Sequence, residues 1–140
     1  MECTVRWTGA HGMQFVADTG SGHSLVMDGA IDGGGHNLAP RPMETVLAGT
    51  GACAAYDVVL ILQRGRHAVS GCEVQLTAER AASDPKVFTA LHFAFLVRGS
   101  NLPQAAVERA VALSHERYCS ASAMLAKTAA ITHSVVIVAA

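Results

Sequence analysis

Charged residues are scarce in this chain of 140 residues. Only 15% of its residues are Asp, Glu, Lys or Arg, whereas 51% are hydrophobic. The ten Lys and Arg residues are scattered and the net charge is −1, so the chain lacks the basic face of a nucleic-acid-binding protein. An apolar composition of this kind favours a buried interface between subunits. The length suits a single domain that spans residues 1–140.

Long hydrophobic segments are also lacking. The apolar run 46–62 contains Asp57 and two glycines, and it is shorter than the roughly 20 residues that a membrane-spanning helix needs. The opening "MECTVRWTGAHG" has no apolar core of the kind found in signal peptides. We therefore expect a cytoplasmic protein that forms oligomers and has no membrane partner.

The spacings typical of metal sites and disulfide scaffolds are absent as well. The cysteines include no CxxC pair, and the seven histidines include no HxxxH pair, so the sequence predicts no metal site. The glycine-rich segment 32–40 lacks a phosphate-binding GK[ST] motif, and no cofactor is expected. In a reducing compartment the cysteines are either buried bystanders or reactive thiols. The four are Cys3, Cys53, Cys72 and Cys119.

The hydrophobic pattern predicts the element order β-β-β-α-β-β-α-α-β, which is an α+β fold. Pro42 and Glu44 favour the start of a long helix that runs to Arg64 and stops at Gly65. This helix is apolar on every side, which predicts that protein surrounds it. The strands are expected at 3–7, 13–18, 23–29, 69–80, 86–99 and 131–138, and the helices at 42–64, 100–118 and 119–129. The inward face of strand 86–99 is expected to carry Val87, Leu91, Phe93, Phe95 and Val97.

Cys53 is the first candidate for chemistry, in the stretch "GTGACAAYDVVLIL". A free cysteine in an apolar helix is most often a small core residue. Cys119, however, lies at a predicted helix break, where a thiol can reach solvent or the end of another helix. A thiol whose pKa is lowered there is reactive, and a second thiol can resolve its sulfenic acid as a disulfide. Sequence spacing alone does not bring the two cysteines together, so both interpretations stay open.

Asp57 follows Cys53 by one helical turn and lies on the same face. An unpaired carboxylate there would raise the pKa of the thiol, so either a cation neutralises Asp57 or the residue holds structure. We favour the structural role. Tyr56 is expected in the core, His36 in a solvated loop and His115 on a helix surface.

Two segments carry a family resemblance. "APRPMETVLAGTGACAAYDVVLIL" and "VERAVALSHERYCSASAMLAKTAAITHS" resemble the OsmC/Ohr family, in its YhfA-like branch. The resemblance extends over nearly the whole chain, including "SGHSLVMDG", "GCEVQLTAER" and "FTALHFAF". It implies an OsmC-like fold, in which an antiparallel sheet wraps around a long central helix within an intertwined homodimer.

The resemblance also implies an activity and the residues that perform it. Members of the Ohr and OsmC branches are thiol peroxidases that reduce organic hydroperoxides. By resemblance, Cys53 is the peroxidatic thiol and Cys119 is the resolving thiol, and an external dithiol reduces the disulfide between them. The substrate is a small hydrophobic peroxide.

The chain departs from the peroxidase branches at the groups that activate the thiol. Those branches place a glutamate ten residues before the helix cysteine, where this chain has Met43; Glu44 is nine residues before it. Nine residues are two and a half turns of a helix, so Glu44 points away from the face that carries Cys53. The family's arginine falls near Ala10 or His11, and Arg41 is the nearest substitute. Arg41 and Glu44, the arginine and the acid nearest to the family's positions, are kept in the predicted catalytic set with Cys53 and Cys119.

Two hypotheses follow from these residues. The first is a thiol-dependent peroxidase for organic hydroperoxides in oxidative or osmotic stress defence, supported by the paired thiols. The second is a non-enzymatic dimeric module that binds a small hydrophobic or reactive compound, or senses redox state through its thiols. The missing acid and arginine favour the second.

Overall fold

The computed structural model describes residues 1–9 and 11–140. These residues form two compact units, 1–48 and 49–140.

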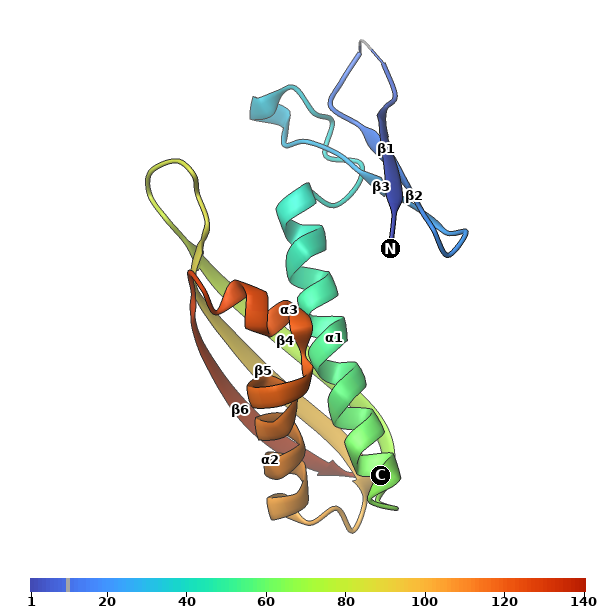
Figure 1. The fold of residues 1–140 in the computed structure, drawn as a ribbon, viewed down its shortest axis with the longest axis vertical. Helices are drawn as coiled ribbons and strands as arrows, with labels where there is room; N and C mark the ends of the chain where they lie inside the picture. Colours follow the sequence, from blue (N-terminus) through green and yellow to red (C-terminus); the bar gives the residue numbers. More distant parts are fainter. Residues whose placement is uncertain (10) are drawn as a thin grey trace. The chain divides into compact units, whose positions relative to one another are not determined.

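The N-terminal unit is a three-stranded antiparallel meander (Figure 1). It consists of β1 (Cys3–Trp7), β2 (Phe15–Thr19) and β3 (Ser24–Met27). The guanidinium of Arg6 on β1 pairs with the carboxylate of Asp18 on β2. The indole N–H of Trp7 donates to the carbonyl of Gly12 at 2.9 Å, which closes the β1–β2 loop. The three expected strands are therefore present.

A buried carboxylate organises the segment that follows β3. Asp28 is 1% exposed and accepts hydrogen bonds from the backbone N–H groups of Gly29, His36 and Leu38 at 2.7, 3.1 and 3.0 Å. These N–H groups, that of Leu38 foremost, hold the pKa of Asp28 below its ordinary value because they stabilise the ionised form. The carboxylate thus fixes the loop around the short 3₁₀ helix Ile31–Gly33.

The long helix α1 has the predicted ends, Pro42–Arg64. At its start the Glu44 carboxylate accepts the backbone N–H of Arg41 at 2.9 Å, which is the reaching-back half of a capping box. At its end the N–H of His67 bonds to the carbonyl of Leu62 and that of Arg66 to the carbonyl of Gln63, a Schellman motif. The left-handed residue of this motif is Arg66, at φ 60°.

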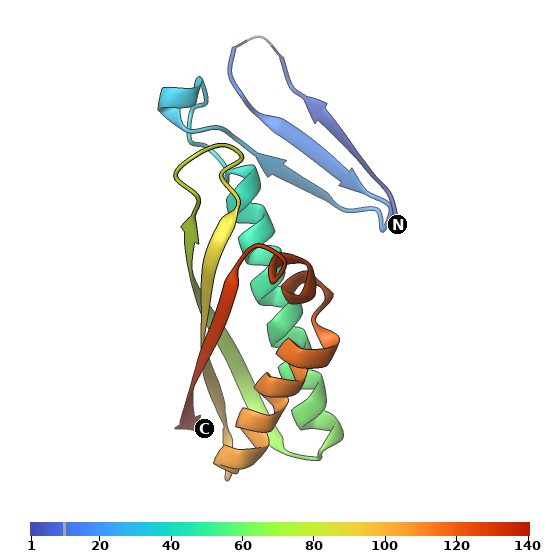
Figure 2. The same cartoon turned by 60° about the vertical axis from the view of Figure 1, so that its left-hand side comes forward.

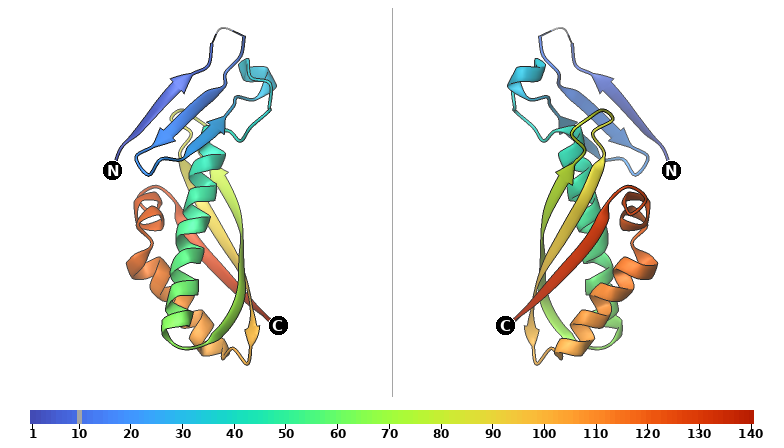
Figure 3. Two further views of the ribbon diagram at one scale, coloured as in Figure 1. Left: turned by 90° about the vertical axis from the view of Figure 1, so that its right-hand side faces the viewer. Right: turned by 90° about the vertical axis from the view of Figure 1, so that its left-hand side faces the viewer.

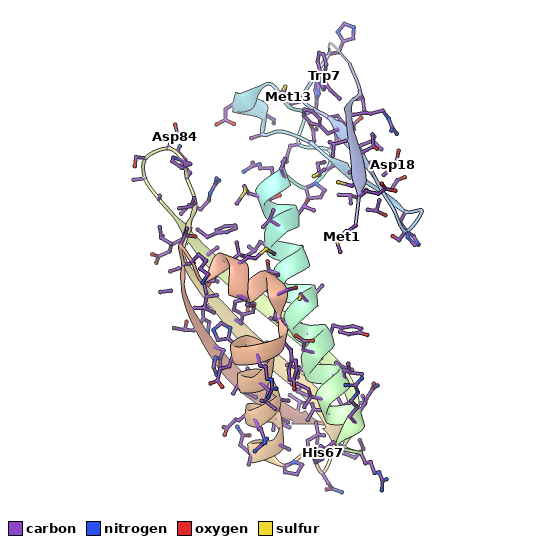
Figure 4. All side chains as sticks on the ribbon, in the orientation of Figure 1. Met1, Trp7, Met13, Asp18, His67 and Asp84 are labelled. Atoms are coloured by element: carbon purple, nitrogen blue, oxygen red, sulfur yellow. The ribbon has the colours of Figure 1, made fainter. Side chains whose placement is uncertain are left out.

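The C-terminal unit contains a three-stranded sheet in the order β4-β5-β6 (Figure 2). Its strands are β4 (Ala68–Arg80), β5 (Phe88–Ser100) and β6 (Ala130–Ala139). β4 and β5 form an antiparallel hairpin, and Asp84 in its loop lies at the opposite end of the sheet from His67 (Figure 4). β5 and β6 pair in parallel. The prediction of one antiparallel sheet is therefore wrong: there are two sheets, and this one is mixed because helices connect β5 to β6.

The helices of the C-terminal unit lie on one face of its sheet (Figure 3). They comprise the part of α1 from residue 49 onward, α2 (Gln104–Leu113), a π-helical turn η2 (Ser114–Tyr118) and α3 (Ser120–Leu125). Gly51 of α1 lies against β4, and a Cβ there would be 2.5 Å from Leu76 Cδ1, so the Leu76 side chain would have to move. The second helix was expected over 100–118, but α2 ends at Leu113 and the chain continues as the π turn.

The core of this unit lies between the sheet and the helices. β5 contributes a period-two row that is at most 4% exposed: Leu91, Phe93, Phe95 and Val97. The fifth expected member, Val87, is 36% exposed, and Phe88 is buried instead. The register of β4 and β5 shifts at this point, since Arg80 pairs with Phe88 and Glu79 with Ala90. The bulge moves the inward position by one residue.

Only one stripe of α1 is buried by its own chain. The stripe has helical spacing and consists of Thr50, Gly51, Ala54, Val58 and Leu62. Tyr56, expected in the core, is 69% exposed. By length and apolar composition alone this helix could cross a membrane, as could many helices of a protein core. In this chain the buried stripe packs on the sheet.

Candidate functional site

The structure brings the two predicted thiols together. Cys53 lies in α1 and Cys119 caps the N-terminus of α3. Their Sγ atoms and a carboxylate oxygen of Asp57 all lie within 4.8 Å of one another. Both cysteines are free thiols, Cys53 half-buried and Cys119 buried at 2% exposure. The hypothesis that Cys53 is an isolated core residue does not describe this arrangement.

Ser122 donates to the Cys119 sulfur twice. Its backbone N–H lies 3.4 Å and its hydroxyl 3.1 Å from Sγ. Burial raises the pKa of Cys119, as does the adjacent Cys53 thiol, whereas both hydrogen bonds from Ser122 lower it. The net direction is upward, so Cys119 is held mainly as a thiol, with two donors ready to stabilise its thiolate.

Asp57 is bound by a serine rather than by a cation. The Ser114 hydroxyl lies 3.2 Å from Asp57 Oδ2 and 3.3 Å from the Ala54 carbonyl. Among the described residues, Arg6 and Asp18 form an ion pair, and no ion pair involves Asp57. The structural role favoured from the sequence stays a prediction, and the Asp57 carboxylate lies beside both thiols.

The π turn places these groups. The N–H of Cys119 bonds to the Ser114 carbonyl at 2.8 Å, five residues back, so the chain widens before α3 begins. A π turn is uncommon and occurs frequently at functional sites. Ser114 at the start of this turn bonds to Ala54 and Asp57 of α1, and Cys119 at its end lies beside Cys53 and Asp57.

A small apolar cavity adjoins the thiol cluster. It measures about 10 Å³, and its wall includes Ala54, Ser114, His115, Ser122 and His133. The rings of His115 and His133 are 6.0 Å apart. Burial and the neighbouring His133 lower the pKa of His115. His115 is thus half-buried against other rings rather than on a helix surface as expected.

The remaining predicted site residues belong to the N-terminal unit. Arg41 and Glu44 meet through the capping bond, which gives Glu44 a structural function, and their catalytic role stays a prediction. His36 is exposed, as expected for a loop, but its backbone is bound by Asp28 and its ring lies against Gly12. Ala10, one of the two positions equivalent to the family's arginine, lies outside the described residues.

Sequence reasoning missed Ser114 and Ser122. Both are 1% exposed, both donate to the cluster, and both flank Cys119 in the chain. The one available signal was a serine three residues after a residue at a helix break, which is a capping distance. Nothing in the spacing indicated that Ser114 would reach α1.

Comparison with known proteins agrees with this fold. The family model described as OsmC-like protein matches residues 34–134. The chain is 47% identical to Protein YhfA of Escherichia coli K12, over the whole of both chains. A structural-genomics structure shares 46% identity over the whole of both chains, with a TM-score of 0.89.

More distant structures share the fold alone. The organic hydroperoxide resistance protein OsmC from Legionella pneumophila has a TM-score of 0.67 at 21% identity, covering 96% of each chain. The organic hydroperoxide resistance protein OhrB of Bacillus subtilis has a TM-score of 0.63 at 17% identity, covering 97% of this chain and 98% of its own. The chain therefore belongs to the OsmC-like family and is similar along its whole length to Protein YhfA.

Proposed function

We propose that the protein is a thiol-dependent peroxidase that reduces small hydrophobic organic hydroperoxides in oxidative or osmotic stress defence. The observation that carries this proposal is the meeting of the Cys53 and Cys119 sulfurs, contributed by α1 and by the start of α3. Two distant structures with this fold are named for organic hydroperoxide resistance. The family membership and the thiol pair point to the same chemistry.

The burial of the two thiols supports their assigned roles. Cys53 is half-buried and Cys119 buried, so a peroxide reaches Cys53 more readily. The Cys53 thiolate attacks one peroxide oxygen and the O–O bond breaks; the alkoxide takes a proton and leaves as an alcohol. Cys53 becomes a sulfenic acid. The Cys119 thiol then attacks its sulfur, releasing water and forming a disulfide that an external dithiol reduces.

The proposal includes a homodimer in the cytoplasm with α1 as its central helix. Tyr56 of α1 is 69% exposed, and Val59 and Leu60, three and four residues further along the helix, are only half-buried by their own chain. A second copy packed on this face would bury them. Arg41 and Glu44 stay in the proposed catalytic set.

One observation favours a second function. The Asp57 carboxylate lies beside both thiols, and a negative charge there disfavours a thiolate. A thiol pair beside a carboxylate suits a non-enzymatic dimer that binds small hydrophobic or reactive compounds, or senses redox state. The two functions differ in turnover.

The test is steady-state consumption of cumene hydroperoxide with a dithiol reductant. We expect continuous turnover that is abolished in Cys53→Ser and strongly reduced in Cys119→Ser. Cys72→Ser is the matched control, because Cys72 lies in β4 and is not part of the cluster. A single stoichiometric reaction without turnover would support the sensor, and thiols that survive an excess of peroxide would refute the peroxidase.

A further inference from the structure

The thiol–carboxylate cluster has the composition of a metal site. Cys53, Asp57 and Cys119 each offer one ligand atom, and the three atoms lie within 4.8 Å of one another. We propose that these three side chains bind a thiophilic divalent cation such as Zn²⁺, with a fourth position open. This inference does not depend on peroxidase activity.

The distances fit tetrahedral coordination. Zinc binds thiolate sulfur at about 2.3 Å and carboxylate oxygen at about 2.0–2.2 Å. Two sulfurs at that distance from one tetrahedral ion are about 3.8 Å apart. The observed upper limit of 4.8 Å therefore requires the two sulfurs to approach by at most about 1 Å, and each sulfur and the carboxylate oxygen by at most about 1.2 Å. Three protein ligands with an open fourth position are typical of catalytic zinc sites.

The surrounding hydrogen bonds suit bound ligands. Ser114 donates to Asp57 Oδ2, and an ionised carboxylate keeps further lone pairs for a cation. Ser122 donates twice to the Cys119 sulfur, the arrangement expected around a metal-bound thiolate. Such partners orient metal ligands and typically change affinity by about 10- to 100-fold. Both serines are buried, so the donors are held in place.

The metal also accounts for Asp57. A carboxylate one turn from a cysteine hinders a free thiolate but helps to bind a cation, because its charge adds to that of the sulfurs. Binding replaces two thiol protons by one cation, so two protons are released for each Zn²⁺ bound. Cys53 and Asp57 are half-buried rather than sealed, which gives the ion a path into the site.

The test uses the full, reduced, metal-free chain and no peroxide. Zinc is titrated in competition with a chromophoric chelator, and cobalt is titrated as a spectroscopic probe. We expect one zinc per chain and a near-ultraviolet thiolate-to-cobalt charge-transfer band. Both are lost in Cys53→Ser and Cys119→Ser and retained in Cys72→Ser. Asp57→Asn should weaken zinc binding at least about tenfold, and Ser122→Ala by about tenfold.

Three outcomes would overturn the proposal. The first is no stoichiometric zinc at micromolar concentration, and the second is zinc binding that persists in both cysteine variants. The third is unchanged affinity in Asp57→Asn, which would remove the carboxylate from the site. Circular dichroism of each variant verifies that it is folded. A chain that binds zinc through this cluster but does not reduce peroxides would refute the proposed activity alone.

Discussion

Ser122→Ala tests whether the hydrogen bonds on Cys119 assist the resolving step. The substitution removes the hydroxyl that lies 3.1 Å from the Cys119 sulfur and keeps the backbone N–H at 3.4 Å. The lost bond favours the thiolate, so its removal raises the pKa of Cys119 further. The alanine fits because it is smaller than the serine it replaces.

The size of the effect follows from two opposing contributions. One hydrogen bond contributes about 1 kcal/mol net, which is roughly fivefold in the thiol–thiolate equilibrium. The thiolate that remains is more nucleophilic, with a Brønsted coefficient of about 0.4–0.5, which offsets nearly half of the loss. We therefore expect disulfide formation to slow about two- to threefold at neutral pH.

The assay is a single-turnover reaction with one equivalent of cumene hydroperoxide. Dimedone trapping measures the Cys53 sulfenic acid, and quenched-flow mass spectrometry measures the disulfide. The sulfenic acid should persist longer in Ser122→Ala and form at the wild-type rate. Ser120→Ala, an exposed serine in the same helix α3, is the control. If the disulfide forms at an unchanged or faster rate in Ser122→Ala, the Ser122 hydroxyl does not assist the resolving step.

Three further predictions concern stability and assembly. Asp28→Asn should destabilise the N-terminal unit, followed by Trp7 fluorescence. The pKa of Asp28 in the folded protein lies below its ordinary value of 3.8. The ionised carboxylate therefore stabilises the fold above that pH, and this stabilisation is lost as the pH falls through the lower folded pKa. An acid-unfolding midpoint that is the same in Asp28→Asn and the wild type would contradict this. Leu62→Ala, at a site 1% exposed, should lower the free energy of unfolding by about 2–5 kcal/mol, and the exposed Gln63→Ala by less than about 0.5 kcal/mol; equal denaturant midpoints would be the wrong result. Tyr56→Glu should dissociate the proposed dimer in analytical ultracentrifugation, and a variant that sediments like the wild type would place the interface elsewhere.

The long helix was predictable at both ends because its signals are local. Pro42 and Glu44 act within the first turn, and Arg64 lies where the helix dipole favours a cation. The element order was predictable for the same reason. The bulge that buries Phe88 instead of Val87 was not, since it depends on the pairing of β4 with β5. Parallel pairing of β6 leaves the same alternation in the sequence as antiparallel pairing.

The site was predictable only in part. Cys53 and Cys119 were candidates from their places in the chain, but their pairing and roles came from the family resemblance, because spacing does not report a contact between distant elements. The contact of Ser114 with α1 depends on the π turn, which has no pattern in the sequence, whereas Ser122 lies at capping distance from Cys119. The carboxylate of Asp57 was recognised as one turn from Cys53, but its serine partner belongs to another element.

The stoichiometry of oxidation shows directly whether Cys53 and Cys119 form one redox pair. The reduced protein is titrated with cumene hydroperoxide, free thiols are counted, and the oxidised product is mapped by peptide mass spectrometry. We expect one equivalent of peroxide to remove two thiols per chain and to yield a Cys53–Cys119 disulfide, with Cys3 and Cys72 unchanged. Intact thiols after an excess of peroxide, or a disulfide between other cysteines, would contradict it.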